Sequence, residues 1–555
     1  MSHTKLKIRE DVAPCVDACP AHIDVPKYVR LISVGKFNDA LSVIRERVPF
    51  PAVLGRVCTR PCEGACSARS PVTPAISIKM LKRFLGDSVR CDDDQCKDKI
   101  KNRSHQIAVI GAGPAGLTAA YNLAKYGYSV SVFEAESEAG GMLVWAIPDY
   151  RLPKSVVQYE ISLIEKEGVR INLGQAIQKE EGLKDLLKNG YSAVFIATGA
   201  AKSRVLNIEG EGFAGVHTGL SLLRRAKSDH HFSIGKKVVV VGGGNVAIDA
   251  ARTAVRLGAD NVCILYRRTK EDMPAIEDEI ALAEEECVEI MDQAVPVEIL
   301  GENNVLNAVK CKKTCPGEPD DSGRRRPIII DDSEFVIKAD TVIKAIGEMP
   351  DADVWGPCKE KIQKVESASL ETAIKGVFAG GDFLRGPGTV VEAVADGIKA
   401  ADAIHQYVSG EVGNAEIIKA DIADTGLSVL QGIPLRIERK EKELSVEERV
   451  AGFEEEIHGL DEGEAVTEAT ECLKCNLPVM IDESRCTGCF NCMIYCSLWN
   501  HGFYSPHESY IKITSNDDGC NLIHFLDDCV GCGICARICP FEALKKVCCV
   551  NDEEG

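Results

Sequence analysis

The 555-residue chain carries 84 acidic against 65 basic residues, which gives a formal net charge of −19 at neutral pH. Such a surface repels nucleic acid and anionic membranes, so neither is expected as a partner. The N-terminal stretch lacks the apolar core of a signal peptide, and no segment approaches the ~20 apolar residues of a membrane span. We therefore expect a cytoplasmic protein of roughly three or four domains, in which paired cysteines favour metal over disulfide bonds.

Cysteine is concentrated at both ends of the chain. Thirteen of the 25 cysteines lie in residues 472–555, seven lie in residues 1–96, and only five lie between. Cysteines in short, regular spacings indicate iron–sulfur clusters, which here flank a middle region with a different task. The candidate ligands near the N-terminus are Cys15, Cys19, Cys58, Cys62 and Cys66.

Residues 107–134 have the pattern of a buried strand, a glycine-rich turn, a helix and a second strand that ends at an acid. The G-x-G-x-x-G turn permits close approach of the backbone to a pyrophosphate at the helix N-terminus, and the acid is placed to accept hydrogen bonds from a ribose diol. We expect residues 101–230 to form the first part of a dinucleotide-binding domain, for which the resemblance described below implies FAD. The candidate contacts are Gly111, Gly113, Pro114, Ala115, Gly116 and Glu134.

Residues 236–258 repeat the strand, turn and helix, with G-x-G-x-x-A at the turn. We expect a Rossmann domain for NAD(P) over residues 231–345, inserted between two parts of the FAD domain. The next strand ends in two arginines rather than an acid, which suits a 2′-phosphate and favours NADP(H) over NAD(H). The alternative is that these arginines are a solvated strand end. The candidate contacts are Gly242, Gly244, Asn245, Val246, Ala247, Arg267 and Arg268.

Several later segments resemble the loops of two-dinucleotide-binding flavoproteins, which implies FAD in the first site and a second part of its domain at residues 346–410. The helix expected at 388–401 would direct its N-terminal amides at the flavin, where the helix dipole favours negative charge. A plain amphipathic surface helix is the alternative. The resemblance implies cofactor contacts at Gly141, Thr198, Gly199, Gly347, Gly381, Asp382, Thr389 and Val390.

Residues 481–555 carry two cysteine quartets, each spaced C-x2-C-x2-C-x3-C. This is the spacing of bacterial two-cluster ferredoxins, in which the fourth cysteine of each run ligates the other cluster. Zinc is the alternative, but zinc usually takes two pairs of ligands rather than two quartets. We expect a ferredoxin-like α+β domain with two [4Fe-4S] clusters. The ligands would be Cys486, Cys489, Cys492 and Cys539 for cluster A, and Cys529, Cys532, Cys535 and Cys496 for cluster B.

The motifs YRRTKEDMPA (266–275), AIGEMPD (345–351) and FAGGDF (378–383) resemble the glutamate synthase small subunit. They also resemble dihydropyrimidine dehydrogenase and the large subunit of NADH-dependent ferredoxin:NADP oxidoreductase. These families have a helical domain with two clusters. Here that domain is expected to be split between residues 1–100 and a linker and helical segment at 411–480.

The resemblance implies ligand sets for both clusters of the split domain. One cluster would take Cys472, Cys475, Cys15 and Cys66, and the other Cys19, Cys58 and Cys62. The relatives supply Gln or Glu as the fourth ligand of the second cluster, whereas this chain has Lys82 at that position. Because an ammonium is a poor iron ligand, the fourth ligand stays open between water, a shifted side chain, and Cys91 or Cys96.

These patterns predict an α/β two-dinucleotide-binding flavoprotein core with an inserted NAD(P) Rossmann domain, a helical iron–sulfur domain and a ferredoxin-like domain. The cofactors would be FAD, NADP or NAD, and four [4Fe-4S] clusters. No Ser/His/Asp or Cys/His nucleophile constellation stands out, so we expect no catalytic side chain, because the cofactors would carry the chemistry.

The expected function is that of an NAD(P)H:acceptor oxidoreductase subunit in a hetero-oligomer, which relays electrons to or from a partner redox enzyme or ferredoxin. Residues 487–513 resemble electron-transfer subunits that serve a separate catalytic subunit. Electron bifurcation is an option that only the family resemblance carries. The alternatives are a glutamate synthase small subunit with an appended ferredoxin domain, and a scaffold that stores clusters.

Overall fold

The computed structural model describes residues 5–7, 12–71, 73–89, 103–320, 323–366, 369–411, 442–473, 475, 479–516 and 520–546. Cys91 and Cys96, two of the fourth-ligand alternatives, lie outside these residues. The chain divides into two compact units. The cysteine unit comprises residues 1–95, 414–441 and 459–555, and the dinucleotide unit comprises residues 96–413 and 442–458. None of the helices in the described ranges is long and apolar enough to cross a bilayer.

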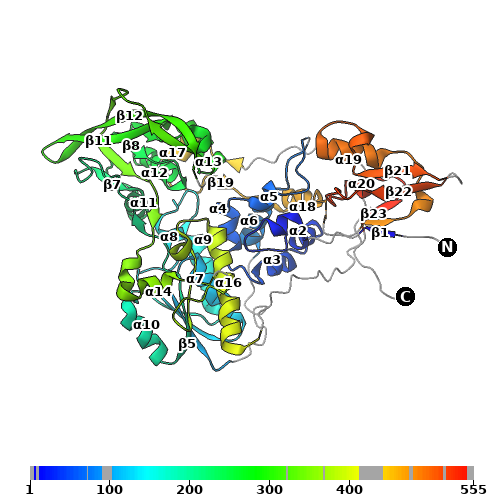
Figure 1. Ribbon diagram of the computed structural model, residues 1–555, viewed down its shortest axis with the longest axis horizontal. Coiled ribbons are helices and arrows are strands. Elements are labelled where there is room, and N and C mark those ends of the chain that lie inside the picture. The colour runs from blue at the N-terminus through cyan, green and yellow to red at the C-terminus, as the bar shows by residue number, and fades with distance from the viewer. Residues whose placement is uncertain are drawn as a thin grey trace. The chain divides into compact units, whose positions relative to one another are not determined.

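The first sheet of the dinucleotide unit has five parallel strands in the order β17-β5-β2-β3-β4. Its central strand is an apolar run, as expected for a parallel strand that is covered on both faces. Helices α7 and α16 pack on each other beside this sheet (Figure 1). The elements are β2 (Gln106–Ile110), α7 (Pro114–Lys125), β3 (Ser129–Phe133), α8 (Met142–Trp145), α9 (Lys154–Lys166), β4 (Arg170–Asn172), α10 (Lys179–Lys188), β5 (Tyr191–Ile196), α14 (Lys359–Gln363), β17 (Val377–Ala379), α15 (Asp382–Arg385) and α16 (Val390–Ser409).

A second parallel sheet, in the order β10-β9-β8-β15-β7, lies in the sequence between β5 and β17. The chain thus leaves the first sheet after β5 and returns at β17, which confirms the predicted inserted Rossmann fold. The elements are β7 (Val216–Thr218), α11 (Gly219–Ser228), β8 (Lys237–Val241), α12 (Asn245–Arg256), β9 (Asn261–Leu265), α13 (Glu277–Glu285), β10 (Glu289–Met291) and β15 (Thr341–Lys344).

Smaller sheets complete the dinucleotide unit. Strands β11, β12, β13 and β14 form an antiparallel sheet, and two short pairs, β6 with β16 and β18 with β19, lie elsewhere in the unit. The bounds are β6 (Lys202–Ser203), β11 (Ala294–Glu302), β12 (Val305–Pro319), β13 (Arg325–Ile329), β14 (Phe335–Lys338), β16 (Glu348–Met349), β18 (Lys442–Glu443), α17 (Val446–Ala451) and β19 (Ile457–His458).

The first half of the cysteine unit is helical. Asp24 caps α2 by accepting a hydrogen bond from the Lys27 amide, and α18 begins with a capping box of Asp461 and Glu464. Helix α18 packs on α2 and α6, although hundreds of residues separate them in sequence. The helices are α1 (Pro14–Asp17), α2 (Val25–Ser33), α3 (Phe37–Arg45), α4 (Pro51–Val57), α5 (Pro61–Gly64), α6 (Ile78–Ser88) and α18 (Glu462–Thr470).

The second half of the cysteine unit is a small α+β fold around a core that includes Ile511, Ile523 and Leu544. The indole Nε1 of Trp499 on α19 donates to the Ser67 carbonyl at 2.9 Å, which joins this fold to the helical half. The elements are β20 (Val479–Ile481), α19 (Asn491–His501), β21 (Ile511–Ser515), β22 (Asn521–Phe525), α20 (Ile534–Ile538) and β23 (Leu544–Lys546), with β1 (Lys5–Lys7) paired to β20.

Candidate dinucleotide and iron–sulfur sites

The turn between β2 and α7 has room for a phosphate only because its residues are small. Gly111 has φ of +103°, and a Cβ at this residue would lie 2.4 Å from the Ala197 carbonyl oxygen. A Cβ at Gly116 would lie 2.0 Å from the Gly111 oxygen, so the helix can close on the turn only without a side chain there. A Cβ at Gly113, which caps α7, would meet nothing within 4 Å. The open space lies at a helix N-terminus, where amides bind anions.

Glu134 is fixed beside this turn. Its Oε2 accepts a hydrogen bond from the Ala112 amide at 2.7 Å, and its Oε1 accepts one from the Glu136 amide at 2.9 Å. A carboxylate has further lone pairs for a ribose diol, because each oxygen can accept more than one hydrogen bond. A Cβ at Gly141 would lie 2.9 Å from the Gly113 Cα, so this second glycine lies against the first turn.

The residues after β17 return to the same turn. A Cβ at Gly381 would lie 2.9 Å from the Ala115 Cβ. The next residue, Asp382, has a buried Oδ1 with no hydrogen-bond partner among the described atoms, and the nearest guanidinium nitrogen, on Arg385, is 4.0 Å away. A buried carboxylate oxygen needs a donor, so this atom fits a polar group of a bound dinucleotide. The residues present therefore fit FAD.

Other predicted FAD contacts lie at turns and at a helix start. Gly199 and Gly347 have φ of +71° and +102°, and the Thr198 Cα would be 3.3 Å from a Cβ on Gly111. Helix α16 begins at Val390, and Thr389 caps it in a capping box with Glu392. The Thr389 side chain is thus already used by the helix, which leaves backbone amides of the first turn for a ligand.

The second Rossmann turn repeats this geometry. Gly242 has φ of +142°, and its Cβ would lie 2.1 Å from the Ala345 carbonyl oxygen. At Gly244 the nearest heavy atom to a Cβ would be 4.0 Å away, so the start of α12 is open. Asn245 and Val246 form the first turn of this helix, and Ala247 is fully buried beneath it. The residues present therefore fit a second dinucleotide.

The two predicted phosphate-binding arginines have different surroundings. Arg268 is buried, with its Nη2 2.5 Å from Asp320 Oδ2 and its Nε donating to the Arg325 carbonyl at 2.8 Å. Arg267 is exposed, and its pKa is lowered by partial burial and by the positive charges of Arg268 and Arg324. Arg268 thus holds the β12–β13 hairpin, whereas Arg267 belongs to a positive group beside the end of β9.

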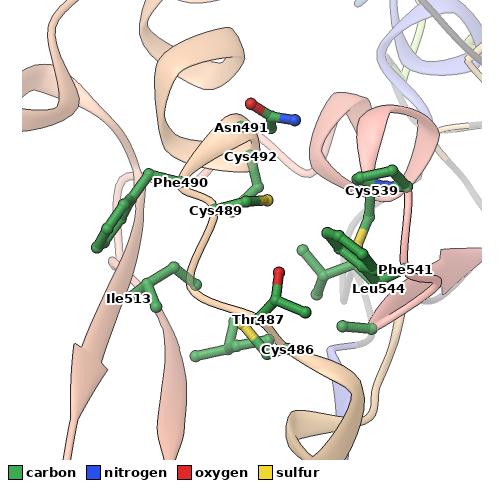
Figure 2. A pocket seen from close by; sticks show the side chains of 13 residues that line it. Cys486, Thr487, Cys489, Phe490, Asn491, Cys492, Ile513, Cys539, Phe541 and Leu544 are labelled. Carbon is green, nitrogen blue, oxygen red and sulfur yellow. The ribbon is translucent and has the colours of Figure 1, made fainter.

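The predicted ligands of cluster A line one cavity in the C-terminal fold (Figure 2). Cys486, Cys489 and Cys492 come from the loop before α19 and its first turn, and Cys539 comes from the end of α20. Burial and the three neighbouring thiols raise the pKa of Cys492 to about 12. Four thiols in an apolar pocket are a donor set that fits an iron–sulfur cluster.

The predicted ligands of cluster B also lie close together. Burial and the negative charge of Cys496 and Cys529 contribute to a pKa of about 12 for Cys532. Cys535 is buried beside Cys532 and Cys529, and its pKa is raised. Cys496 of the first run thus lies near thiols of the second run, and Cys539 of the second run lies near thiols of the first.

A third group of thiols brings the two ends of the chain together. The pKa of Cys15 is raised by burial and by the neighbouring thiols of Cys475, Cys472 and Cys66. The Ser77 amide donates to Glu468 Oε1 at 2.8 Å, which supports this arrangement by tying the start of α6 to α18. The four cysteines assigned by resemblance are thus neighbours in the folded chain.

The fourth group contains three cysteines among the residues that the structure describes. Burial raises the pKa of Cys62 to about 12, and the groups that act on it include Lys82, Cys58 and Cys19. The hydroxyl of Tyr28, a fully buried residue near Cys62, Cys15 and Cys19, has no hydrogen-bond partner among the described atoms. An unsatisfied buried hydroxyl beside these thiols fits a sulfur acceptor that a cluster would supply.

No three His, Cys, Asp or Glu side chains in the described ranges could hold one metal ion together. A cubane does not require such convergence, because each of its irons takes its own thiolate.

Two residues beside the thiols, Tyr28 and Lys546, were not among the predicted site residues. Lys546 is half-buried near Cys535, Cys475, Cys532 and Cys529, so its side chain lies close to both the third thiol group and cluster B. No spacing rule identifies either residue. The only signal for Lys546 is its position in a short strand directly after the second quartet.

The comparisons with known proteins cover most of the chain. Residues 105–397 match the family model of pyridine nucleotide-disulphide oxidoreductases. Residues 9–94 match the model of dihydropyrimidine dehydrogenase domain II, 4Fe-4S cluster, and residues 523–545 match a 4Fe-4S binding domain.

Similar curated proteins are named as subunits of larger enzymes. The chain is 37% identical over 511 residues to NADPH-Fe(3+) oxidoreductase subunit beta of Geobacter sulfurreducens, covering 83% of this chain and 75% of that one. It is 38% identical over 503 residues to NADP(+)-dependent formate dehydrogenase subunit beta of Moorella thermoacetica, covering 83% and 70%. It is 34% identical over 420 residues to the glutamate synthase [NADPH] small chain of Azospirillum brasilense, covering 72% and 86%.

Proposed function

The chain belongs to the pyridine nucleotide-disulphide oxidoreductase family, and we propose that it is the NADPH-dependent flavin and iron–sulfur subunit of a larger redox enzyme. The observation that carries the proposal is the presence, in one chain, of two open dinucleotide turns and four groups of neighbouring thiols. FAD exchanges electron pairs with a nicotinamide and single electrons with iron–sulfur clusters, so the protein has to bind, orient and insulate these groups.

The first Rossmann turn would hold FAD. Its glycines admit the pyrophosphate at the start of α7, Glu134 receives the ribose, and Asp382 supplies a buried acceptor on the other side. The second turn would hold the nicotinamide dinucleotide at the start of α12. Arg267 and its positive neighbours favour a 2′-phosphate, and the relatives are named for NADPH or NADP(+), so we assign NADP(H).

Four [4Fe-4S] clusters would occupy the thiol groups. The protein's contribution is to bury the thiols in apolar pockets, which limits access of water to the clusters and sets their potentials. Cys489 is the exposed member of its group, so cluster A is the one nearest to solvent and to an external electron acceptor. We assign the last transfer, to a separate redox subunit or ferredoxin in the cytoplasm, to this site.

Glutamate synthase small subunit remains a second candidate because of the 34% identity to that protein. The first candidate is favoured because the two beta subunits cover 83% of this chain against 72%. A scaffold that only stores clusters would not need two dinucleotide turns with an open helix N-terminus.

The test is an anaerobic titration of the purified chain, followed by flavin and cluster absorbance. We expect NADPH to bleach both bands and NADH to do so only at a much higher concentration. A preparation without flavin or iron, or one that neither nucleotide reduces, contradicts the proposal. A glutamine amidotransferase subunit that co-purifies with the chain would favour glutamate synthase instead.

A further inference from the structure

One of the four thiol groups differs from the other three in composition and charge. Within the part of the chain that the structure describes, the other groups each bring four cysteines together, whereas this one has Cys19, Cys58 and Cys62. No fourth thiol of the described residues joins them, and the side chain of Lys82 lies beside them. The difference between the sites is thus a lost negative charge and a gained positive one.

Lys82 is buried without a conventional partner. It lies on α6 and is 3% exposed. Among the described residues its ammonium has no hydrogen bond and no carboxylate within ion-pair distance, and the groups that act on it are Cys58, Cys62, Cys19 and, more weakly, Glu63. A buried cation is strongly unfavourable unless an anion compensates it. The burial of Lys82 is therefore explained by an anionic group held by these thiols.

Glu63 is the carboxylate nearest to this site, and other contacts already engage it. Its Oε1 accepts a hydrogen bond from the Lys79 amide at 2.7 Å, and its Oε2 lies 3.9 Å from the Arg60 Nε. It thus joins α5 to the first turn of α6. An ammonium has no lone pair for iron, so Lys82 does not replace the missing thiolate, and Glu63 is held by the Lys79 amide and Arg60.

We propose that Cys19, Cys58 and Cys62 bind a cluster through three protein thiolates only, and that Lys82 is its charge partner rather than its ligand. This rests on the proposed function, since it assumes that the thiol groups bind clusters. With one thiolate fewer and one cation more, the site is two charge units more positive than a four-thiolate site. Net charge is one of the factors that set cluster potentials, so this cluster is the most easily reduced of the four and retains electrons longest.

The experiment is an EPR-monitored redox titration of the full chain carrying Lys82→Met, with Lys79→Met as the matched control. Both variants remove one lysine charge from α6, but Lys79 is not among the groups that act on Cys62. We expect Lys82→Met to lower the reduction potential of the cluster that is reduced first. The expected shift is at least about 59 mV, which is a tenfold change in the equilibrium constant of a one-electron couple. Lys79→Met and the charge-retaining Lys82→Arg should leave it within a few-fold of the original.

A second variant keeps the proposal testable if Lys82→Met folds poorly. Lys82→Cys supplies a fourth thiol, and we expect it to lower the potential of this cluster further than Lys82→Met does. In its Mössbauer spectrum, all irons of this cluster should have the parameters of thiolate-ligated iron. The proposal is overturned if Lys82→Met and Lys79→Met give the same potential, or if the unaltered protein already shows four thiolate-ligated irons at this site. It is also overturned if Lys82→Met and Lys82→Arg both lose iron, because that result is expected when Lys82 itself is a ligand.

An error in the proposed function and an error in the role of Lys82 would give different experimental results. If Cys58→Ser removes neither iron nor an EPR signal, the thiol group holds no cluster and the proposed function is wrong at this site. If Cys58→Ser removes a signal and Lys82→Met leaves its potential unchanged, the cluster exists and only the role of Lys82 is wrong.

Discussion

The two Rossmann units use the same strand, turn and helix, yet they differ at the third small residue and at the surface their helix presents. Gly116 in the first unit has no room for a Cβ, whereas the second unit already carries Ala247 at the matching position. In the first unit the second strand, β3, is followed by Glu134. In the second unit the second strand, β9, is followed by Arg267. The backbone pattern is thus shared, while tightness of the turn and charge at the strand end differ, and our proposed assignment of two different dinucleotides rests on the second difference.

The two helices also pack by different physics. On α7, the small residues let α16 approach so closely that a Cβ at Gly397 would lie 2.4 Å from the Ala115 carbonyl oxygen. On α12, Arg252 is fully buried in an ionic network instead. Its Nη2 lies 2.5 Å from Glu456 Oε2 and 2.7 Å from Glu286 Oε1. One unit is held by close packing of backbone, and the other by buried charge.

The largest effect is expected for Gly116→Ala. The new Cβ would lie 2.0 Å from the Gly111 oxygen, so the turn must open and the pyrophosphate site is lost. We expect the purified variant to contain almost no flavin by its absorbance ratio. Gly212→Ala is the matched control, because Gly212 is an exposed glycine of the dinucleotide unit with nothing within 4 Å of its Cβ position. Full flavin content in Gly116→Ala would show that the two turns are equally tolerant.

Glu456→Gln tests the other side of the comparison. The substitution removes the negative charge of Glu456, which pairs with both Arg252 and Arg256. The two buried guanidinium groups then have one carboxylate fewer to balance their positive charge. Breaking one partner of a buried ion pair costs about 3–5 kcal/mol. We expect a clear loss of stability in denaturant unfolding monitored on the dinucleotide unit, with NADPH affinity retained after refolding. Glu455→Gln removes a neighbouring acid as the control, and an equal effect of both variants would contradict the network's role.

The contrast between local and distant contacts also decides how far the sequence could be interpreted. Both turns and both ferredoxin-type quartets are set by spacings within about 30 residues, so their chemistry follows from the sequence pattern. The proximity of Cys15 to Cys472 could be inferred only from resemblance to a family, because no spacing rule joins positions so far apart. The structure brings these thiols together through the packing of α18 on α2 and α6.

The contacts that the sequence did not reveal all depend on tertiary packing. Arg268 fits a phosphate site by its position after β9, but Asp320 from the β12–β13 hairpin pairs with it. Arg252 and Glu456 are separated by 204 residues, and a charged residue on a helix is usually solvated. Lys82 was recognised as a departure from the relatives, but its burial beside three thiols could not be known before the fold.

A smaller effect is expected for Arg267→Ala, which tests whether charge at the strand end selects the dinucleotide. Loss of a charged hydrogen bond to a phosphate is worth about 1.5–3 kcal/mol, so the KM for NADPH should rise about 10- to 100-fold while that for NADH changes little. Steady-state reduction of an artificial acceptor measures both constants. Arg326→Ala, on the exposed face of β13, is the control. An equal rise for both nucleotides would mean that Arg267 does not recognise the 2′-phosphate.

The smallest effect is expected for Ala247→Gly, which gives the second unit the residue that the first one requires. Ala247 is the third residue of α12, and in a helix glycine is less favourable than alanine by about 1 kcal/mol because of backbone entropy. Its side chain is fully buried in the core around this turn, but it does not crowd the turn, since even a Cβ placed on Gly242 would be 3.5 Å from it. We therefore expect a small drop in unfolding free energy and an unchanged KM for NADPH. A marked gain in NADPH affinity would show that the alanine holds the second turn open, and that the two units differ in function at this residue as well as in packing.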